Sequence, residues 1–434
     1  MGHALCPSPV ISLDGPLIYL QELRKKNLST VTDLDGFEEV FGLCPQGLAA
    51  VFEAYPDCRR NFFSEVLPFI VDAASRLSTK ELKRLEAGKV DQVFLPRDLV
   101  VSLLAHMFLC TFRDLPSNMP YAGFDLLLFR VNKHCPQELA KLRMFIHYFD
   151  RCRLEMPKGE LRIYRQVRPA AKTGSTWRES KWPLLELNVA PPFTGFEDEV
   201  GRGCLHADFA NQCLGGGVLV GGCVQEEIRF SICPELCAAM LVCPIMLDNE
   251  AITIVGGDAA GEQFCSYEGY GRSLRFGADY RDRSPRDADG TVLQAITAMD
   301  ALDFRGRDSS LRTQLQEPLL LRELEKAAAA FAPVDEAALA QWPIIATGNW
   351  GCGAFEGCAE LKAILQWLAA SEGRRRLLYF PFDLEHLGPQ LTELSRDLCT
   401  ARVTVGQLYS ALMSEPRPKR ATEIFEHLKR KLLG

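Results

Sequence analysis

The stretch Gly215–Phe230 reads GGGVLVGGCVQEEIRF, a run of glycines that leads directly into two adjacent carboxylates. Glycine adopts positive φ readily and lets the backbone approach a ligand without a Cβ atom in between. Bare N–H groups in such a loop form a concavity that suits a phosphate group. Glu226 and Glu227 follow within a few residues, so acid chemistry lies beside the predicted phosphate cradle. The stretch therefore predicts a site where a phosphorylated sugar or nucleotide is cut and not merely held.

The residues before this loop have the pattern of a strand. Leu205, Ala207 and Phe209 alternate with polar residues, and the run ends on Asp208 and Asn211, whose side chains suit sugar hydroxyls at a strand terminus. The loop has neither the G-K-[ST] of a P-loop nor the G-x-G-x-x-G of a dinucleotide fingerprint. A tight structural turn would use the same three glycines, so the glycines alone do not decide between the two interpretations.

The acidic pair that follows Gln225 has two interpretations. Adjacent residues in an extended segment point opposite ways, so one glutamate reaches the scissile bond. The other then holds a sugar hydroxyl and raises its partner's pKa towards the value that a general acid needs. In the alternative interpretation, Glu226 and Glu227 are a solvated pair at the start of a helix, where the helix dipole favours acids. The residue types leave both open.

The composition limits the function classes. The chain has 434 residues, 47% hydrophobic and 24% charged, which suggests a globular protein of two domains. A net charge of −7 argues against direct binding of nucleic acid. The 16 cysteines are scattered, without C-x-x-C pairs, so we expect free thiols in a reducing compartment and no metal site. The apolar run Leu99–Phe112 is too short to span a membrane, and residues 1–20 lack the pattern of a signal peptide.

Periodicity divides the chain near residue 150. Residues 1–150 have apolar positions at helical spacing and are expected to form a helical domain, in which Ser78 and Glu81 form a capping box. Residues 151–434 alternate short strand-like runs with helices, which indicates an α/β domain with a mainly parallel sheet. The expected strands are Leu161–Val167, Leu184–Val189, Leu205–Phe209, Ala251–Val255, Ala295–Asp300, Trp342–Ala346 and Arg376–Phe382.

A second glycine-rich loop, GNWGCGAFEG at residues 348–357, follows an expected strand and precedes an expected helix. That order places a helix N-terminus against a diphosphate. A Rossmann cofactor site is the competing interpretation, but Glu356 occupies the position of its third glycine. Tyr267 and Tyr270 form a third cluster, which either stacks on a flat base or consists of ordinary aromatic residues in a turn.

Taken together, these motifs resemble a known family. The order DFAN-x-x-x-GGG-x(7)-QEEIRF, then Y-x-G-Y, then ATGNWGCGAF is similar to that of the poly(ADP-ribose) glycohydrolases of the eukaryotic type, over roughly residues 95–385. The resemblance implies a macrodomain-like mixed sheet flanked by helices and preceded by an α-helical accessory domain. It also implies hydrolysis of the ribose–ribose O-glycosidic bonds of poly(ADP-ribose), with release of ADP-ribose and without a metal or cofactor.

The resemblance assigns roles to individual residues. Glu227 would protonate the leaving ribose oxygen and then activate water, while Glu226 would hold ribose hydroxyls. The remaining site residues implied by the resemblance are Asp208 and Asn211 in the ribose pocket, Gln225 in the signature, Gly215, Gly216, Gly217, Asn349, Gly353, Ala354 and Phe355 around the diphosphate and neighbouring ribose, and Tyr267, Tyr270, Phe196 and Glu197 towards the adenine.

The chain departs from the family pattern in a few places. Glu356 and Cys358 replace an expected glycine and aspartate, and an extra residue lies between Glu197 and Asp208. Two other functions remain open: a non-catalytic reader of ADP-ribose, and a hydrolase of single protein-linked ADP-ribose units. The expected partner is poly(ADP-ribose) on modified proteins, and the expected form is a monomer in the nucleus, the cytoplasm or both.

Overall fold

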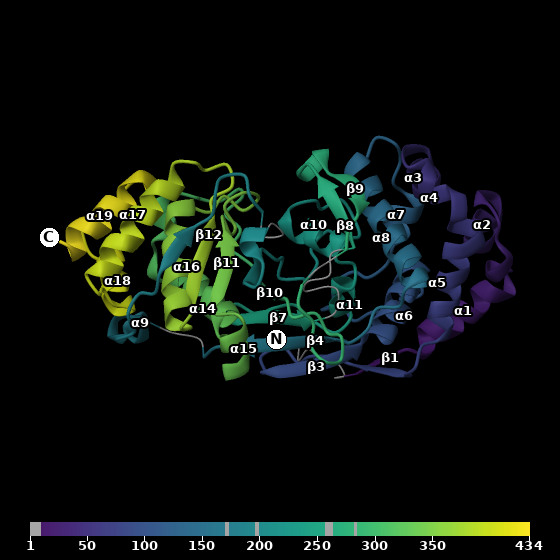
Figure 1. Ribbon diagram of the computed structural model, residues 1–434, viewed down its shortest axis with the longest axis horizontal. Helices are drawn as coiled ribbons and strands as arrows, with labels where there is room; N and C mark the ends of the chain where they lie inside the picture. The colour runs from purple at the N-terminus through teal and green to yellow at the C-terminus, as the bar shows by residue number, and fades with distance from the viewer. Residues whose placement is uncertain (1–9, 170–172, 196–198, 257–263, 282–283) are drawn as a thin grey trace.

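An eight-stranded mixed sheet lies at the centre of the molecule, between the N-terminal helices and a C-terminal group of helices (Figure 1). The computed structural model describes residues 10–169, 173–195, 199–256, 264–281 and 284–434. The sheet order is β3 (Asp91–Pro96), β4 (Glu160–Val167), β7 (Glu250–Gly256), β10 (Ala295–Ala298), β6 (Leu205–Asp208), β11 (Ile344–Gly348), β12 (Arg376–Phe380) and β5 (Leu187–Val189).

The strand directions divide this sheet into two halves. From β10 through β6, β11 and β12 to β5 all pairings are parallel, whereas β3, β4, β7 and β10 pair antiparallel. The prediction of a mainly parallel sheet therefore holds for one half, and the sheet as a whole is mixed. Parallel strands end at the same edge, so the loops that follow Asp208, Ala298, Gly348 and Phe380 emerge together.

Helices form most of residues 1–150, as the helical spacing predicts, but those at Asp14–Lys25, Pro56–Asn61 and Asp125–Phe129 were not among the expected stretches. The bounds of the helices in this part of the chain are α1 (Asp14–Lys25), α2 (Leu34–Phe41), α3 (Gln46–Ala54), α4 (Pro56–Asn61), α5 (Leu67–Ser75), α6 (Arg97–Phe108), α7 (Asp125–Phe129) and α8 (Pro136–Leu154). They share one hydrophobic core with α10 (Gln225–Ile232) and α11 (Leu236–Met240), and this core continues onto one face of the sheet through Ile252, Ile254 and Ile296. The helical part is thus packed onto the sheet and has no separate core.

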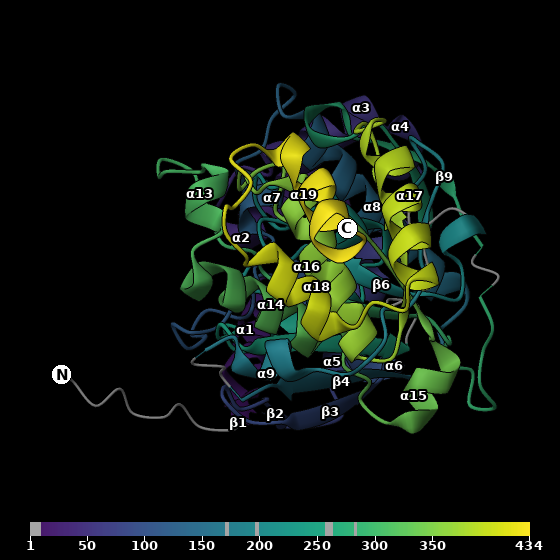
Figure 2. The same ribbon diagram turned by 90° about the vertical axis from the view of Figure 1, so that its left-hand side faces the viewer.

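A second core covers the opposite face of the sheet. Ala251, Val255 and Ala295 point into it, which follows from the alternation of side chains along a strand. The helices around this core are α9 (Ser175–Glu179), α13 (Leu311–Gln314), α14 (Glu317–Phe331), α15 (Glu336–Gln341), α16 (Ala359–Glu372), α17 (Leu387–Thr400), α18 (Val405–Leu412) and α19 (Ile424–Leu432). Figure 2 shows α17, α18 and α19 in front of α16, at the end of the molecule away from the helical part.

Two predictions for the first 150 residues are wrong. Ser78 and Glu81 do not cap a helix, because Glu81 begins β2 (Glu81–Lys83), which pairs with β1 (Val10–Ser12). The region is also not purely helical, since β3 is an edge strand of the main sheet. The domain boundary at residue 150 stays a prediction. One strand of the main sheet, β3, comes from the part of the chain before that residue.

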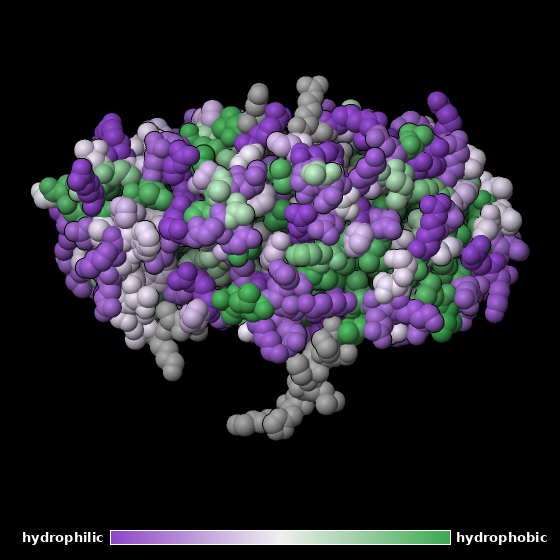
Figure 3. All heavy atoms as spheres, turned by 60° about the horizontal axis from the view of Figure 1, so that its bottom comes forward, coloured by the Kyte–Doolittle hydropathy of each residue, from purple (hydrophilic) through white to green (hydrophobic). Residues whose placement is uncertain are grey.

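A small hairpin stands outside the main sheet. It consists of β8 (Cys265–Glu268) and β9 (Arg275–Asp279), which pair antiparallel, and neither strand was expected from the sequence. Figure 1 shows it beside α10 and α8. The face of the molecule in Figure 3 is mainly polar, with apolar residues in small groups. None of the described helices is both long and apolar enough to cross a membrane.

Candidate functional site

The two adjacent glutamates lie in the first turn of α10, directly behind the carboxyl end of β6. Glu226 is 2% exposed and Glu227 is 7% exposed. The prediction of an extended segment is therefore wrong, because both residues are helical. The alternative of a solvated pair is also wrong, although it places the glutamates correctly at a helix start. What the sequence pattern does not reveal is that this helix start is buried.

Gln225 fastens α10 to the end of β6. Its Oε1 accepts a hydrogen bond from the backbone N–H of Phe209 at 2.8 Å, and its Nε2 donates to the carbonyl of Ala207 at 3.4 Å. Its side-chain amide therefore fixes the distance between the helix start and Asp208, the last residue of the strand.

The two carboxylates hold the loop that connects strand and helix. Glu226 accepts hydrogen bonds from the backbone N–H groups of Asn211 at 2.8 Å and Gly215 at 2.6 Å. Glu227 accepts one from Gly217 at 2.9 Å on Oε1 and one from Val224 at 2.8 Å on Oε2. Charge-assisted bonds of this kind are stronger than neutral ones, so the loop and the carboxylates position each other.

The glycines are required by this close packing. Gly216 has φ +50°, and a Cβ atom there would lie 2.6 Å from Glu226 Oε2 and 2.6 Å from Glu227 Oε1. A Cβ on Gly222 would also lie 2.6 Å from Glu227 Oε1, and one on Gly217 would lie 2.8 Å from the Cα of Gly222. No other residue fits these positions without displacing a carboxylate or the backbone of the loop.

Asp208 completes a group of three buried carboxyls. It is 1% exposed, and neither of its side-chain oxygens has a hydrogen-bond partner among the described residues. Burial raises the pKa of Asp208 to about 8; the charge of Glu227 adds to the increase and Arg229 opposes it. Burial, with the charges of Asp208 and Glu227, also raises the pKa of Glu226 well above its usual value. Asp208 and Glu226 interact and titrate together, so this pair retains a proton at neutral pH.

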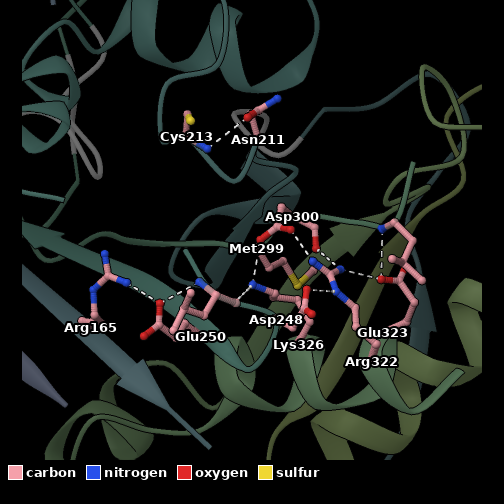
Figure 4. A network of polar contacts seen from close by, with 12 residues as sticks. Arg165, Asn211, Cys213, Asp248, Glu250, Met299, Asp300, Arg322, Glu323 and Lys326 are labelled. Carbon is pink, nitrogen blue, oxygen red and sulfur yellow. Dashed lines mark hydrogen bonds and ion pairs between the residues drawn. The ribbon is translucent and has the colours of Figure 1, made fainter. Parts of the chain in front are cut away.

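Asn211 has mainly a local role in this structure. Its Oδ1 accepts a hydrogen bond from the N–H of Cys213 at 3.0 Å, which forms an Asx turn at the start of the loop. Figure 4 shows Asn211 and Cys213 above a buried group of charged side chains that includes Asp300, Arg322 and Lys326. In the described ranges, no three His, Cys, Asp or Glu side chains are grouped to hold a metal ion.

The second glycine-rich loop, residues 348–357, begins at the end of β11 and leads to α16, as expected. Both ends of the Asn349 amide are occupied, since Nδ2 donates to the carbonyl of Pro381 at 2.9 Å and Oδ1 accepts from the Tyr379 hydroxyl at 3.0 Å. Gly353 and Ala354 are exposed, while Phe355 is half-buried, with the Arg305 guanidinium 5.2 Å from its ring centroid. Asn349 therefore shapes the loop, and the turn at Gly353 offers its backbone to solvent.

A group of buried charged side chains packs beside this second loop and supports it. Lys326 lies 2.7 Å from Asp300, and Arg322 lies 2.6 Å from Glu323 (Figure 4). Lys362 of α16 contacts Glu323, and its Nζ lies 3.9 Å from the ring centroid of Trp350. The Trp350 indole N–H donates to the carbonyl of Met299 at 3.0 Å, which ties the loop to the end of β10.

Three exposed aromatic rings gather near the carboxyl edge. Tyr270 is 48% exposed and Phe382 is 45% exposed, and their centroids lie 6.1 Å apart; Phe193 lies 6.2 Å beyond Phe382. Phe193 and Phe382 both have positive φ, at 58° and 54°, which is strained for a bulky residue and typical of functional sites. Neither phenylalanine was expected from the sequence, since each lies in a loop that only the sheet brings beside Tyr270.

The hairpin that carries Tyr270 is held by α8. Arg143 stacks on Phe276 with its guanidinium carbon 4.2 Å from the ring centroid, and His147 contacts Asp279 at 2.9 Å. Burial raises the pKa of the Tyr270 hydroxyl, and a hydrogen bond from the backbone N–H of Gln225 opposes this increase, which places the hydroxyl at the N-terminus of α10.

The structure describes Tyr267, the second tyrosine predicted to lie near the adenine, but not the segment predicted to contact the adenine itself. Tyr267 is half-buried in β8 and packs against the first core, so it supports the hairpin more than it faces solvent. Phe196 and Glu197 lie outside the described residues, and their assignment stays a prediction.

The chain matches a known family over most of its length. Residues 175–388 match the macrodomain-fold part, and residues 55–165 the helical-domain part, of the poly(ADP-ribose) glycohydrolase family. The chain is 32% identical over 401 residues to poly(ADP-ribose) glycohydrolase 1 of Arabidopsis thaliana, covering 76% of this chain and 71% of that protein. It is 31% identical over 375 residues to poly(ADP-ribose) glycohydrolase 2 of Caenorhabditis elegans, covering 84% of this chain and 73% of that protein.

A solved structure is also similar. The crystal structure of poly(ADP-ribose) glycohydrolase from Deinococcus radiodurans in complex with ADP-ribose has 18% sequence identity and a TM-score of 0.30, covering 54% of this chain and 95% of that one. The macrodomain-like mixed sheet with a preceding helical domain, implied by the sequence resemblance, is confirmed by the family match. The chain belongs to the poly(ADP-ribose) glycohydrolase family.

Proposed function

We propose that the chain hydrolyses the ribose–ribose O-glycosidic bonds of poly(ADP-ribose), with Glu227 as both the general acid and the general base. The family supports the reaction class: the chain is a glycosidase that acts on poly(ADP-ribose) and releases ADP-ribose. The observation that carries the role of Glu227 is its carboxylate, which is held at both oxygens by backbone N–H groups beside two further buried carboxyls.

The cluster formed by Asp208, Glu226 and Glu227 supplies the proton that the reaction needs. Since burial raises the pKa of Asp208 to about 8 and also raises that of Glu226, these two carboxyls keep at least one proton beside Glu227 at neutral pH. A general acid is most effective when its proton is available near the working pH. Glu226 and Asp208 therefore act on the reaction partly through Glu227, by keeping a proton in its immediate surroundings.

The chemistry proceeds in two proton transfers. Glu227 donates its proton to the ribose oxygen that leaves, and the bond between that oxygen and the anomeric carbon breaks. The Glu227 carboxylate then takes a proton from a water molecule as the water oxygen adds to the oxocarbenium-like carbon. One water is consumed for each bond, and Glu227 ends protonated as it began.

The surrounding groups suit the rest of the substrate. The exposed backbone at Gly353 and Ala354 offers N–H groups to a diphosphate, and Glu226 and Asp208 retain lone pairs for ribose hydroxyls. The N–H groups of Gly215, Gly216 and Gly217 are already bonded, to Glu226, Cys213 and Glu227, so the first loop shapes the site and does not present these donors to a phosphate. Tyr270 and Phe382 present ring faces on which a base stacks.

The setting of this activity is also part of the proposal. We infer that the protein acts as a monomer on polymer attached to modified proteins, in the nucleus, the cytoplasm or both. The cysteines in the described part of the chain are free thiols, which supports a reducing compartment. The net charge of −7 gives no basis for direct binding of nucleic acid.

The substitution Glu227→Gln tests the role of the acid. It keeps the size and one of the two hydrogen-bond acceptors but removes the transferable proton, so chain-shortening activity should fall by about 10²–10⁴-fold. The matched control is Glu356→Gln, an exposed glutamate in the second loop, which should keep wild-type activity. If Glu227→Gln retains more than about a tenth of wild-type activity, the assignment of the acid is wrong.

The choice of substrate separates this proposal from the two alternatives. Wild-type protein is incubated with labelled polymer and with mono-ADP-ribosylated protein, each in the presence of a chelator. Release of ADP-ribose from the polymer supports the proposal. Tight binding of polymer without release would indicate a reader, and release from mono-modified protein alone would indicate the other hydrolase.

A further inference from the structure

A lysine of the helical part reaches into the active-site loop. Lys141 lies on α8 and is fully buried. Its Nζ donates to the carbonyls of Gly217 at 3.2 Å, Val220 at 2.7 Å and Gly222 at 2.6 Å. Three donors of one ammonium group are thus used on three carbonyls of a single loop.

Burying the ammonium group of Lys141 without a carboxylate partner costs free energy of folding. A buried ammonium group loses its hydration, and such groups are normally paired with a carboxylate. In the described part of the chain, the close partners of Lys141 Nζ are carbonyl oxygens and not carboxylates. A methionine or leucine would fill the same space in the core without this cost, so packing alone does not explain a lysine.

The three carbonyls belong to the loop that holds Glu227. Gly217 links the two sides, since its carbonyl accepts from Lys141 and its N–H donates to Glu227 Oε1. The loop closes on itself, because the Gly222 N–H donates to the Gly217 carbonyl at 3.0 Å, and Val224 then donates to Glu227 Oε2. The peptide units whose carbonyls face Lys141, those after Gly217 and Gly222, adjoin the units that carry the N–H groups of Gly217 and Val224, so fixing the former restrains the donors to Glu227.

We propose that Lys141 is a positioning residue that holds the loop Gly217–Val224, and through it the Glu227 carboxylate, in the reactive geometry. The helical part thereby contributes directly to the active site, and this inference rests on the proposed role of Glu227. Burial lowers the pKa of Lys141 to about 8, opposed by the nearby Glu227, Glu138, Cys223 and Cys237. The ammonium form, which alone has three N–H donors, therefore prevails at neutral pH.

The test compares Lys141→Met with Lys141→Arg. Methionine keeps the length and removes the donors, so the Glu227 carboxylate is misplaced and kcat should fall by about 10–100-fold. The KM for polymer should change by less than about 3-fold, because the groups that bind adenine and diphosphate stay in place. Arginine keeps the charge and the donors, so Lys141→Arg should have a higher kcat than Lys141→Met. Lys133→Met, an exposed lysine just before α8, serves as the control.

Hydrogen exchange gives a second readout that does not need activity. The amides of Val218, Val220 and Gly222 are bonded inside the loop, and in Lys141→Met they should exchange at least about 10-fold faster, while those of α8 stay protected. If Lys141→Met does not fold, Lys141→Gln, which retains one donor group, takes its place in both measurements.

The outcomes separate this inference from the proposed function. If wild-type protein releases no ADP-ribose, the proposed function fails, and the exchange of the loop amides alone decides whether Lys141 holds the loop. If wild type is active and Lys141→Met keeps kcat within 3-fold, or leaves loop exchange unchanged, the inference is overturned. It is also overturned if Lys141→Arg is no better than Lys141→Met, because the charge at residue 141 is then not what holds the loop.

Discussion

The two glycine-rich loops at the carboxyl edge of the sheet look alike in sequence and are built differently. In the loop Gly215–Gly222, the glycines pack against the carboxylates of Glu226 and Glu227, and side chains accept the loop's N–H groups. In the loop at residues 348–357, a Cβ on Gly353 would meet no atom within 4 Å. The first loop therefore positions the carboxylate of Glu227. The second loop exposes its backbone to solvent and is supported by buried charged side chains.

Breaking the buried ion pair that supports the second loop should have the largest effect, and this effect should be on stability. Lys362 and Glu323 are 2% and 4% exposed and form an ion pair, so Lys362→Met leaves Glu323 buried without this partner. Breaking a buried pair in this way costs about 3–5 kcal/mol. Denaturant unfolding measures the loss, and Lys133→Met is the exposed control. A loss below about 1 kcal/mol would show that the second loop does not depend on these charges.

Adding one methyl group to the first loop should instead affect catalysis. In Gly216→Ala the new Cβ displaces the carboxylates of Glu226 and Glu227, and a shift of about 1 Å in a reacting group costs on the order of 10²-fold in kcat. Steady-state kinetics on polymer, together with the Tm, separates this effect from unfolding. Wild-type kcat in a folded Gly216→Ala would mean that the glycines form only a turn.

The raised pKa of Asp208, which lies beside the first loop, should make the stability of the protein depend on pH. The pKa of Asp208 is raised to about 8, above its unfolded value of 3.8, so its contribution to stability is full below pH 4 and is lost as the pH rises through 8. Asp208→Asn cannot ionise and should be more stable relative to wild type at pH 9 than at pH 4, by a Tm difference on the order of 2 °C or more. Thermal unfolding at both pH values measures this, and an equal difference at both would contradict it.

The smallest effect is expected at the second loop's exposed glycine. Gly353→Ala adds a methyl group where nothing lies within 4 Å, and its φ is not in the left-handed region, so kcat and KM for polymer should each stay within about 3-fold of wild type. The same kinetic assay used for Gly216→Ala provides the comparison. A loss as large as that of Gly216→Ala would mean that both loops carry the same constraint.

Much of the fold was predictable because its elements follow local patterns. The long helices α6, α8, α14 and α16 repeat apolar residues at helical spacing, and the expected strands appear within a few residues of their predicted bounds. Short strands such as β2 and β9 were missed, because three to five residues carry too little periodicity to compete with the surrounding pattern.

The site was predictable as a set of motifs but not as an arrangement. Asp208, Gln225, Glu226 and Glu227 all lie together, yet the sequence left the acidic pair equally open to an extended or a solvated helical interpretation. The answer, a buried helix start, depends on the packing of α10 against distant helices. Asn349 was expected to contact ligand, whereas Tyr379 and Pro381 occupy its side chain.

By itself, the sequence determined the chemistry that the protein holds and the order in which the chain presents it. Glycines beside two glutamates, a second glycine loop and paired tyrosines are local facts that require no fold. Only the tertiary structure decided which of these groups act together. Parallel strands deliver the two loops and Phe382 to one edge, and α8, far away in the chain, places Lys141 under the loop that holds Glu227. Burial and charge between distant residues create the raised pKa of Asp208, and such interactions have no signature in a linear sequence.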